Sequence, residues 1–259
     1  MTALPPVLPE AFLRTPLAHR ALHDAGEGRP ENSRAAIRAA IAHGYGVEID
    51  LQPSRDGAAM VFHDYDLGRL TPETGPLRQR DAAQLAHIPL RGGDEGIPDL
   101  PEILRLIAGR VPLLIELKDQ HGQMGQTDGT LEAATAAALA GYAGPVAVMS
   151  FNPQMMIAMA ALAPDVPRGL VTCAYDPADW PLLREETRAR LRTIPDYAAA
   201  GASFVSHHVR DLANPRLAAL RADGAAILCW TVRSPQDEAR ARSVADSITF
   251  EGYLPDIPA

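Results

Sequence analysis

The chain has 259 residues, of which 47% are hydrophobic and 22% charged, so its composition is that of a globular protein and excludes disorder, collagen and coiled coil. A net charge of -8 argues against a nucleic-acid partner bound through its phosphates. No apolar run approaches the roughly 18 residues that a membrane span needs, and residues 1–14 lack a signal-peptide pattern. Two cysteines, Cys173 and Cys229, make no disulfide framework or zinc cluster, so we expect reduced thiols and a cytoplasmic location.

Short apolar runs alternate along most of the chain with alanine-rich segments of helical pattern. The predicted strands are 16–20, 46–51, 59–63, 112–117, 145–151, 168–173, 203–207 and 226–232. The predicted helices are 33–43, 100–109, 129–141, 153–163, 180–192, 214–223 and 235–245. The first helix is the most clearly marked, with Asn32 or Ser33 available as its cap and Gly44 after its end.

Strands that alternate with helices predict parallel βαβ units, and eight such units favour a closed barrel. We therefore expect an α/β fold, an irregular (β/α)8 TIM barrel, as a single domain over residues 1–259. A doubly wound open sheet is the alternative. The polar region 64–99 lacks clear periodicity and is expected to be a short insertion after the third strand.

Three carboxylates are predicted to share one location. In strand 46–51 the apolar residues alternate with Glu48 and Asp50, and in 112–117 they alternate with Glu116. Because side chains of a strand alternate between its two faces, all three carboxylates should point inward near the C-terminal ends of their strands. Buried carboxylates repel one another, and a hard divalent cation such as Mg²⁺ or Ca²⁺ would compensate them.

Two histidines, His19 and His63, end predicted strands and are candidates for general acid and base. The pairing of strand 59–63 decides where His63 lies. The Asp56-Gly57 turn signal favours locally an antiparallel hairpin. We expect a distorted parallel pair instead, because an antiparallel strand would carry His63 to the opposite rim, away from Glu48.

Two cations accompany these groups. Lys118 is the only lysine among 24 basic residues and follows Glu116 by two positions, so it should share the inward face. Arg20 directly follows His19 and reaches the site only if the strand ends at His19. Both cations would suit a phosphoryl oxyanion.

Aromatic residues at two further strand ends, Phe151 and Trp230, are expected to line the pocket and contact substrate, with core packing as the alternative. The segment 176–200 is longer than a typical loop and carries several arginines. We expect a solvated amphipathic helix there, and the alternative is a lid that contacts an anionic head group.

These residues lie in an ordered series of motifs through which the chain resembles the glycerophosphodiester phosphodiesterases, a family of phospholipase-C-like barrel phosphodiesterases. The matching segments are His19-Arg20, Pro30-Glu31-Asn32-Ser33, Glu48-Ile49-Asp50, Asp56-Gly57, Val61-Phe62-His63-Asp64, Leu67-Gly68-Arg69-Leu70-Thr71, Ile97-Pro98-Asp99-Leu100-Pro101-Glu102-Ile103-Leu104, Glu116-Leu117-Lys118, Ser150-Phe151 and Trp230-Thr231-Val232. The sequence departs from the family where Ala21 follows His19-Arg20 and where Ile248-Thr249-Phe250 stands near the C-terminus.

The resemblance implies an irregular TIM barrel and metal-dependent hydrolysis of glycerophosphodiesters to glycerol 3-phosphate and an alcohol. The metal ligands it implies are Glu48, Asp50 and Glu116 for Mg²⁺ or Ca²⁺, with Mn²⁺ as a further option. The acid and base it implies are His19 and His63, and the phosphate contacts Arg20 and Lys118.

The expected partner is a small-molecule phosphodiester, without nucleic acid or an integral membrane segment. The alternatives are a lysophospholipase-D-like or other phosphodiesterase on the same site, or a non-catalytic binder of phosphate ligands. The sequence leaves open the oligomeric state and the roles of Glu31 and Asn32.

Overall fold

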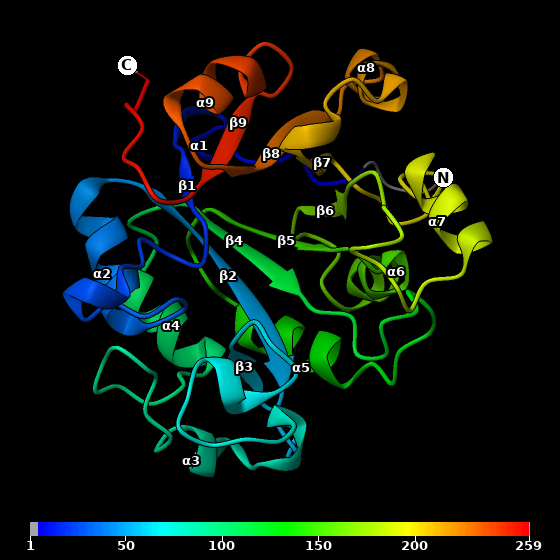
Figure 1. Ribbon diagram of the computed structural model, residues 1–259. Coiled ribbons are helices and arrows are strands. Elements are labelled where there is room, and N and C mark those ends of the chain that lie inside the picture. The colour runs from blue at the N-terminus through cyan, green and yellow to red at the C-terminus, as the bar shows by residue number, and fades with distance from the viewer. Residues whose placement is uncertain (1–4, 259) are drawn as a thin grey trace. The chain divides into compact units, whose positions relative to one another are not determined.

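The computed structural model describes residues 5–258 (Figure 1), and the chain divides into two compact units. The first unit comprises residues 17–118 and 128–146, and the second comprises 5–16, 119–127 and 147–258. The strands of the first unit are β1 (Leu17–Ala18), β2 (Gly46–Pro53), β3 (Ala59–Val61) and β4 (Leu113–Leu117). Its helices are α2 (Arg34–His43), α3 (Ala82–Leu85), α4 (Leu100–Ile107) and α5 (Thr130–Leu139), with 3-10 turns η1 (Ala25–Glu27), η2 (Leu67–Arg69) and η3 (Leu77–Gln79).

The central strand of the first unit is β2, which pairs in parallel with both β1 and β4. In the pairing of β2 with β4, Asp50 lies opposite Glu116, and Leu51 lies opposite Leu117, the last residue of β4. Beyond that point β2 continues to Pro53 and pairs only with β3, which runs antiparallel to it. The predicted parallel pairing of 59–63 is therefore wrong.

A tight turn explains this antiparallel pairing. Gly57 adopts a left-handed backbone with φ +83°, which glycine accepts without steric cost. The N–H of Ser54 donates to the carbonyl of Ala58 at 2.9 Å, which closes the hairpin. The local Asp-Gly signal thus gave the correct pairing, and the argument from the position of His63 did not.

The second unit contains a parallel sheet of five strands, of which only the first residue, Val146, is assigned to the first unit: β5 (Val146–Ser150), β6 (Arg168–Thr172), β7 (Phe204–His208), β8 (Ala226–Val232) and β9 (Ser247–Phe250). Its helices are α1 (Ala11–Arg14), α6 (Pro153–Leu162), α7 (Glu185–Arg192), α8 (Pro215–Ala222) and α9 (Pro235–Ala241), with the 3-10 turn η4 (Val209–Asp211). None of the helices between residues 5 and 258 has the length and apolar character needed to cross a lipid bilayer.

Strand β9 was not predicted. It has only four residues, and two of them, Ser247 and Thr249, are polar although buried, so it lacks the apolar pattern of the other strands. With β9, and without the antiparallel β3, the described residues provide eight parallel strands, three in the first unit and five in the second. This succession of strands and helices confirms the (β/α)8 TIM-barrel fold.

Helix α2 follows directly after the segment that carries Glu31 and Asn32. Its cap is Ser33, whose side chain accepts the N–H of Ala36 at 3.1 Å. The helix ends at His43, and the residue after it, Gly44, caps it with φ +74°. The buried residues of α2 pack against β2 and thereby hold residues 31–33 beside that strand.

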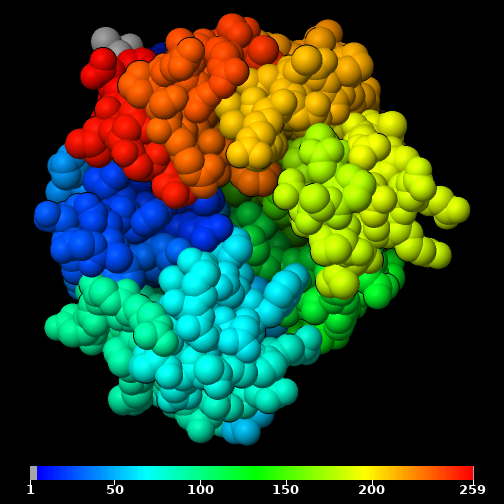
Figure 2. Space-filling view, viewed as in Figure 1, coloured from blue at the N-terminus to red at the C-terminus, as the bar shows by residue number. Residues whose placement is uncertain are grey.

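The insertion 64–99 has an apolar core of its own beside β3. The buried side chains of this cluster are Met60, Phe62, Leu67, Leu70, Leu77, Leu85, Ile88, Leu90 and Ile97. In Figure 2 the insertion forms one continuous cyan-to-teal mass within the first unit. This core supports the residues that follow β3 and, with them, turn η2. The single-domain interpretation of the whole chain stays a prediction.

We expect Leu77→Ala to lower the free energy of unfolding by about 2–5 kcal/mol, because it removes a buried side chain and leaves a cavity in the insertion core. Urea denaturation measures this loss. The same substitution at Leu162, which is half exposed, should cost less than about 0.5 kcal/mol. Equal effects of the two substitutions would contradict a packed core in the insertion.

Candidate functional site

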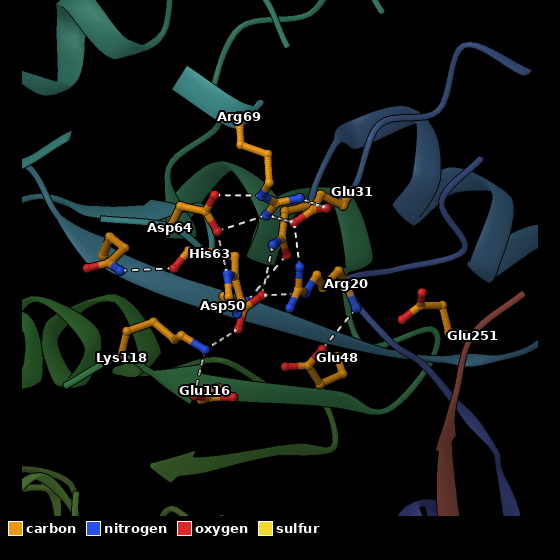
Figure 3. Close-up of polar contacts among 12 residues, drawn as sticks. Arg20, Glu31, Glu48, Asp50, His63, Asp64, Arg69, Glu116, Lys118 and Glu251 are labelled. Atoms are coloured by element: carbon orange, nitrogen blue, oxygen red, sulfur yellow. Dashed lines mark hydrogen bonds and ion pairs between the residues drawn. The ribbon is translucent and has the colours of Figure 1, made fainter. Parts of the chain in front are cut away.

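Three carboxylates converge on one face of the parallel strands of the first unit. Glu48 and Asp50 are two residues apart in β2, and Glu116 lies opposite Asp50 in β4. Because strand side chains alternate between faces, this register places all three on the same face. All three are buried, and one oxygen from each lies within 4.8 Å of the others (Figure 3). The predicted carboxylate cluster is present.

The three carboxylates differ in how their charge is compensated. Burial, together with the charges of Asp50 and Glu116, raises the pKa of Glu48 well above its usual value. Burial would also raise the pKa of Asp50, but Lys118 and the other nearby cations outweigh it, so this pKa is lowered. Asp50 is therefore held ionised, and Glu48 is the carboxylate whose charge is least compensated.

The single lysine lies against this cluster. The Lys118 Nζ donates to Glu116 Oε1 at 2.8 Å and lies 3.2 Å from Asp50 Oδ1. Burial alone would lower the pKa of Lys118, but the two carboxylates outweigh it and raise that pKa, so the ammonium stays protonated. Three oxygen donors with incomplete compensation fit a hard divalent cation such as Mg²⁺ or Ca²⁺.

Arg20 reaches the cluster because the first strand is short. Strand β1 ends at Ala18, and Arg20 has a left-handed backbone with φ +51°. Its backbone N–H donates to Glu48 Oε2 at 2.9 Å, and its guanidinium Nε lies 3.6 Å from Asp50 Oδ2. A regular strand would have turned this side chain away. The sequence condition for Arg20, an early end to the strand, is met.

His63 lies beside the cluster although β3 is antiparallel, so the expectation that an antiparallel strand would carry it to the opposite rim is wrong. Strand β2 runs three residues beyond Asp50 before the hairpin turns back. The chain after β3 therefore returns to the level of Asp50, whose carbonyl accepts the Phe62 N–H at 2.9 Å. The pKa of Asp50 is raised by burial and lowered by the surrounding cations. Lys118 has the largest lowering effect, and His63 and His19 are close enough to lower it as well.

Asn32 is a site residue whose role the sequence left open. It is not the helix cap, because it has a left-handed backbone with φ +59° and its side chain turns to β2. Its Nδ2 donates to Asp50 Oδ2 at 3.0 Å, and its Oδ1 accepts the Asp50 N–H at 3.3 Å. A buried asparagine that holds both the backbone and the carboxylate of Asp50 fixes the orientation of that carboxylate. The available signal was the tolerance of asparagine for left-handed backbone.

Three further charged residues surround these groups, and sequence reasoning noted them only as motif matches. Glu31 accepts a hydrogen bond from the Arg20 guanidinium, and Asp64 contacts the His63 imidazole. Arg69 of η2 donates hydrogen bonds to both of these carboxylates. Their mutual contacts join segments up to 38 residues apart, which no local sequence pattern reveals.

The predicted substrate contacts Phe151 and Trp230 lie together in an aromatic cluster of the second unit. Their ring centroids are 5.4 Å apart, and the Trp180 ring lies 4.8 Å from that of Phe151. Trp180 belongs to the segment 176–200, in which helix α7 buries Leu191 and exposes most of its other residues. The amphipathic helix is thus present, and the contact of these aromatic rings with substrate stays a prediction.

A sequence model of the family described as "Glycerophosphoryl diester phosphodiesterase family" matches residues 19–247. The putative glycerophosphodiester phosphodiesterase YhdW of Bacillus subtilis (strain 168) is 25% identical over 253 residues, which cover 93% of this chain and 94% of that protein. Human glycerophosphodiester phosphodiesterase 1 is 40% identical over a shorter stretch of 96 residues, 33% of this chain and 28% of the human protein.

Solved structures show the same fold. The structure of a phosphodiesterase from Oleispira antarctica, in complex with the product sn-glycerol-3-phosphate, superposes with a TM-score of 0.74 at 23% sequence identity. The alignment covers 93% of this chain and 94% of the Oleispira chain.

We expect both Asn32→Gly and Asn32→Ala to destabilise the protein, because each leaves the buried Asp50 without its amide partner at a cost of about 1–3 kcal/mol. Asn32→Ala should cost about 0.5–1 kcal/mol more than Asn32→Gly, because alanine disfavours the left-handed backbone at this position. Urea denaturation of the two variants measures the difference. An alanine variant as stable as the glycine variant would contradict the left-handed conformation.

We expect Mg²⁺, Ca²⁺ or Mn²⁺ to raise the Tm, since a ligand of the folded state adds about 2.7 kcal/mol of stability at 100 times its Kd. Glu48→Gln should lose most of this shift. Without metal, the same variant should be at least as stable as the wild type, because a neutral amide removes repulsion with Asp50 and Glu116.

Thermal unfolding followed by circular dichroism, with EDTA or with each metal, measures these changes in Tm. Glu132→Gln is the matched control, because Glu132 is also a buried glutamate but lies outside the carboxylate cluster, and it should keep the full metal shift. A metal shift that survives Glu48→Gln would show that the cation binds elsewhere.

Proposed function

The chain belongs to the glycerophosphoryl diester phosphodiesterase family, and on this premise we propose that it hydrolyses glycerophosphodiesters to sn-glycerol 3-phosphate and an alcohol with the help of a divalent cation. The observation that carries the proposal is the buried carboxylate cluster of the first unit, with cationic and imidazole side chains around it. The sn-glycerol-3-phosphate bound to the Oleispira protein supports this product class for the present chain.

Glu48, Asp50 and Glu116 would hold the cation, Mg²⁺, Ca²⁺ or Mn²⁺, which when bound supplies positive charge to the phosphate oxygens of the substrate. Arg20 and Lys118 add fixed positive charge beside the same cluster. Both would stabilise the negative charge that grows on the phosphoryl oxygens in the transition state.

The two histidines divide the proton transfers. One of His19 and His63 takes a proton from the nucleophile, which is water or the glycerol 2-hydroxyl of the substrate, as its bond to phosphorus forms. The other donates a proton to the departing oxygen as the bond from phosphorus to the alcohol breaks. When water is the nucleophile, this step gives sn-glycerol 3-phosphate directly. When the 2-hydroxyl is the nucleophile, this step gives a cyclic phosphate, and water then forms a bond to phosphorus while the bond to the 2-oxygen breaks and that oxygen regains a proton. Two imidazoles near one cluster can serve both roles near neutral pH.

The aromatic residues Phe151 and Trp230 are proposed to contact the alcohol portion of the substrate. The segment 176–200 contributes Trp180 to the same aromatic cluster, which supports the lid hypothesis over a helix that is merely solvated. We also propose a cytoplasmic location, because Cys173 and Cys229 are both free, and a small-molecule partner in place of nucleic acid, because the chain is acidic.

The test is release of sn-glycerol 3-phosphate from glycerophosphocholine by the purified protein, first with EDTA and then with each metal. We expect metal-dependent release, and we expect His19→Ala and His63→Ala each to lower kcat about 10²–10⁴-fold, the usual contribution of a general acid or base. His87→Ala is the control, because this exposed histidine of the insertion lies outside the site and should leave kcat unchanged.

Near wild-type turnover in both site variants would contradict the proposed roles of the histidines. Release from a lysophospholipid but not from glycerophosphocholine would replace the proposal by the lysophospholipase-D-like alternative. Binding of glycerol 3-phosphate without turnover of either substrate would indicate a binding protein.

A further inference from the structure

A continuous series of charged contacts joins His63 to Arg20 through three intervening side chains of the first unit (Figure 3). It begins at the His63 imidazole, whose Nδ1 lies 2.6 Å from Asp64 Oδ1. Arg69 then contacts Asp64 with two nitrogens, Nε to Oδ2 at 2.6 Å and Nη2 to Oδ1 at 2.8 Å. From Asp64 through Arg69 and Glu31 to Arg20 the charges alternate in sign, so every neighbouring pair of these groups attracts.

The same guanidinium also makes a two-point contact with Glu31 on its other edge. Arg69 Nη1 donates to Glu31 Oε2 at 2.7 Å, and Nη2 donates to Oε1 at 2.9 Å. Glu31 Oε1 in turn accepts Arg20 Nη1 at 2.8 Å. One side chain of the insertion therefore connects two segments that carry groups of the proposed reaction, the turn after β1 and the turn after β3.

We propose that Arg69 is a positioning residue that orients His63 through Asp64 and Arg20 through Glu31. This inference rests on the proposed function, because it assigns a role in the same reaction. Arg69 itself touches neither the carboxylate cluster nor the atoms that react, and its effect passes through the two carboxylates that it holds.

The chemistry of the guanidinium explains why an arginine stands here. A guanidinium is planar and has N–H donors on two edges, so it can donate two hydrogen bonds to each of two carboxylates at once. The ammonium of a lysine is a single point charge and cannot make this double two-point contact. Burial would raise the pKa of both Glu31 and Asp64, but their bonds to Arg69 and the neighbouring cations outweigh it and lower both pKa values. Both carboxylates therefore stay ionised acceptors.

An ionised Asp64 has consequences for the tautomer of His63. A carboxylate without a proton can only accept, so the Nδ1 of His63 must carry the proton of their 2.6 Å bond. In the neutral imidazole this leaves the lone pair on Nε2, which is then the atom that exchanges a proton with the reacting groups. Without Arg69, the Asp64 side chain could rotate away from His63. The proton of the neutral imidazole would then no longer be held on Nδ1, and both tautomers would be populated.

Arg20 needs support of a similar kind. It sits in a left-handed backbone conformation, which an arginine adopts at an energetic cost and only when the surroundings hold it there. Its carbonyl accepts the Asn32 N–H at 2.9 Å, and its guanidinium is held by Glu31. Arg69 fixes that glutamate and so indirectly fixes the direction in which Arg20 points.

The test compares wild type, Arg69→Ala and Arg69→Lys in the glycerophosphocholine assay. We expect Arg69→Ala to lower kcat about 10–100-fold, as misplacement of catalytic groups by about 1 Å does, with KM changed less than about threefold. Arg69→Lys should regain little, because lysine makes a single contact. Guanidinium ion at millimolar concentrations should restore part of kcat to Arg69→Ala, because 48% of the Arg69 side chain is exposed and its position is open to solvent.

Arg78→Ala is the matched control. Arg78 belongs to the same insertion, 47% of its side chain is exposed, and it makes one ion pair, with Asp128 at 3.5 Å. It should keep wild-type kcat and show no response to guanidinium. Arg69→Ala should also keep the rise in Tm on metal addition, because the carboxylate cluster is untouched. A kcat within twofold of wild type for Arg69→Ala, or a loss that guanidinium does not relieve, would overturn the proposal.

A second readout does not depend on activity. Nitrogen-15 spectra of the histidine side chains, with His63 assigned from the His63→Ala variant, should show the Nδ1-protonated tautomer in the wild type and a mixture in Arg69→Ala. The same tautomer in both proteins would overturn the proposal. A wild type that is inactive on every phosphodiester but shows the tautomer change would refute the proposed function and leave the positioning role of Arg69 intact.

Discussion

The repulsion among three buried carboxylates is the constraint on which the rest of the first unit depends. Strand alternation and the parallel register bring Glu48, Asp50 and Glu116 together, so their charges must be compensated from other segments. The compensation comes from Lys118 directly after β4, from Arg20 in a left-handed turn and from the Asn32 amide. Two of the residues with left-handed backbone, Arg20 and Asn32, therefore contact the carboxylate cluster directly.

Much of this arrangement could be predicted from the sequence because it depends on local periodicity. Alternation along β2, and along β4 with the residue that follows it, places the three carboxylates and Lys118 on one face without any knowledge of tertiary contacts. The (β/α)8 fold also followed from alternating strand and helix patterns, although the predicted set of strands included the antiparallel β3 and omitted β9. Two hydroxyl side chains in a four-residue strand are too weak a signal to identify β9.

The features that sequence reasoning missed are those that depend on chain reversal and on distant pairing. His63 reaches the site because β2 continues beyond its parallel pairing with β4 before the hairpin turns back. The direction of β3 alone does not tell how far β2 extends before that turn. The contacts of Arg69 with Glu31 and Asp64 likewise depend on how the insertion core packs against β3. A long polar segment with scattered leucines gave no periodic pattern from which this packing could be derived.

The chain has one lysine, so it offers one side-chain amine to reagents that modify amines. A protease that cleaves only after lysine has one target bond in the chain, after Lys118, and an acylating reagent meets one side-chain amine, inside the candidate site. The ion pairs with Glu116 and Asp50 keep that amine protonated and therefore slow to acylate. Anything that draws these two carboxylates away from the amine would change its rate of labelling, so the acylated fraction of the peptide that contains Lys118, measured by mass spectrometry, would report the state of this site.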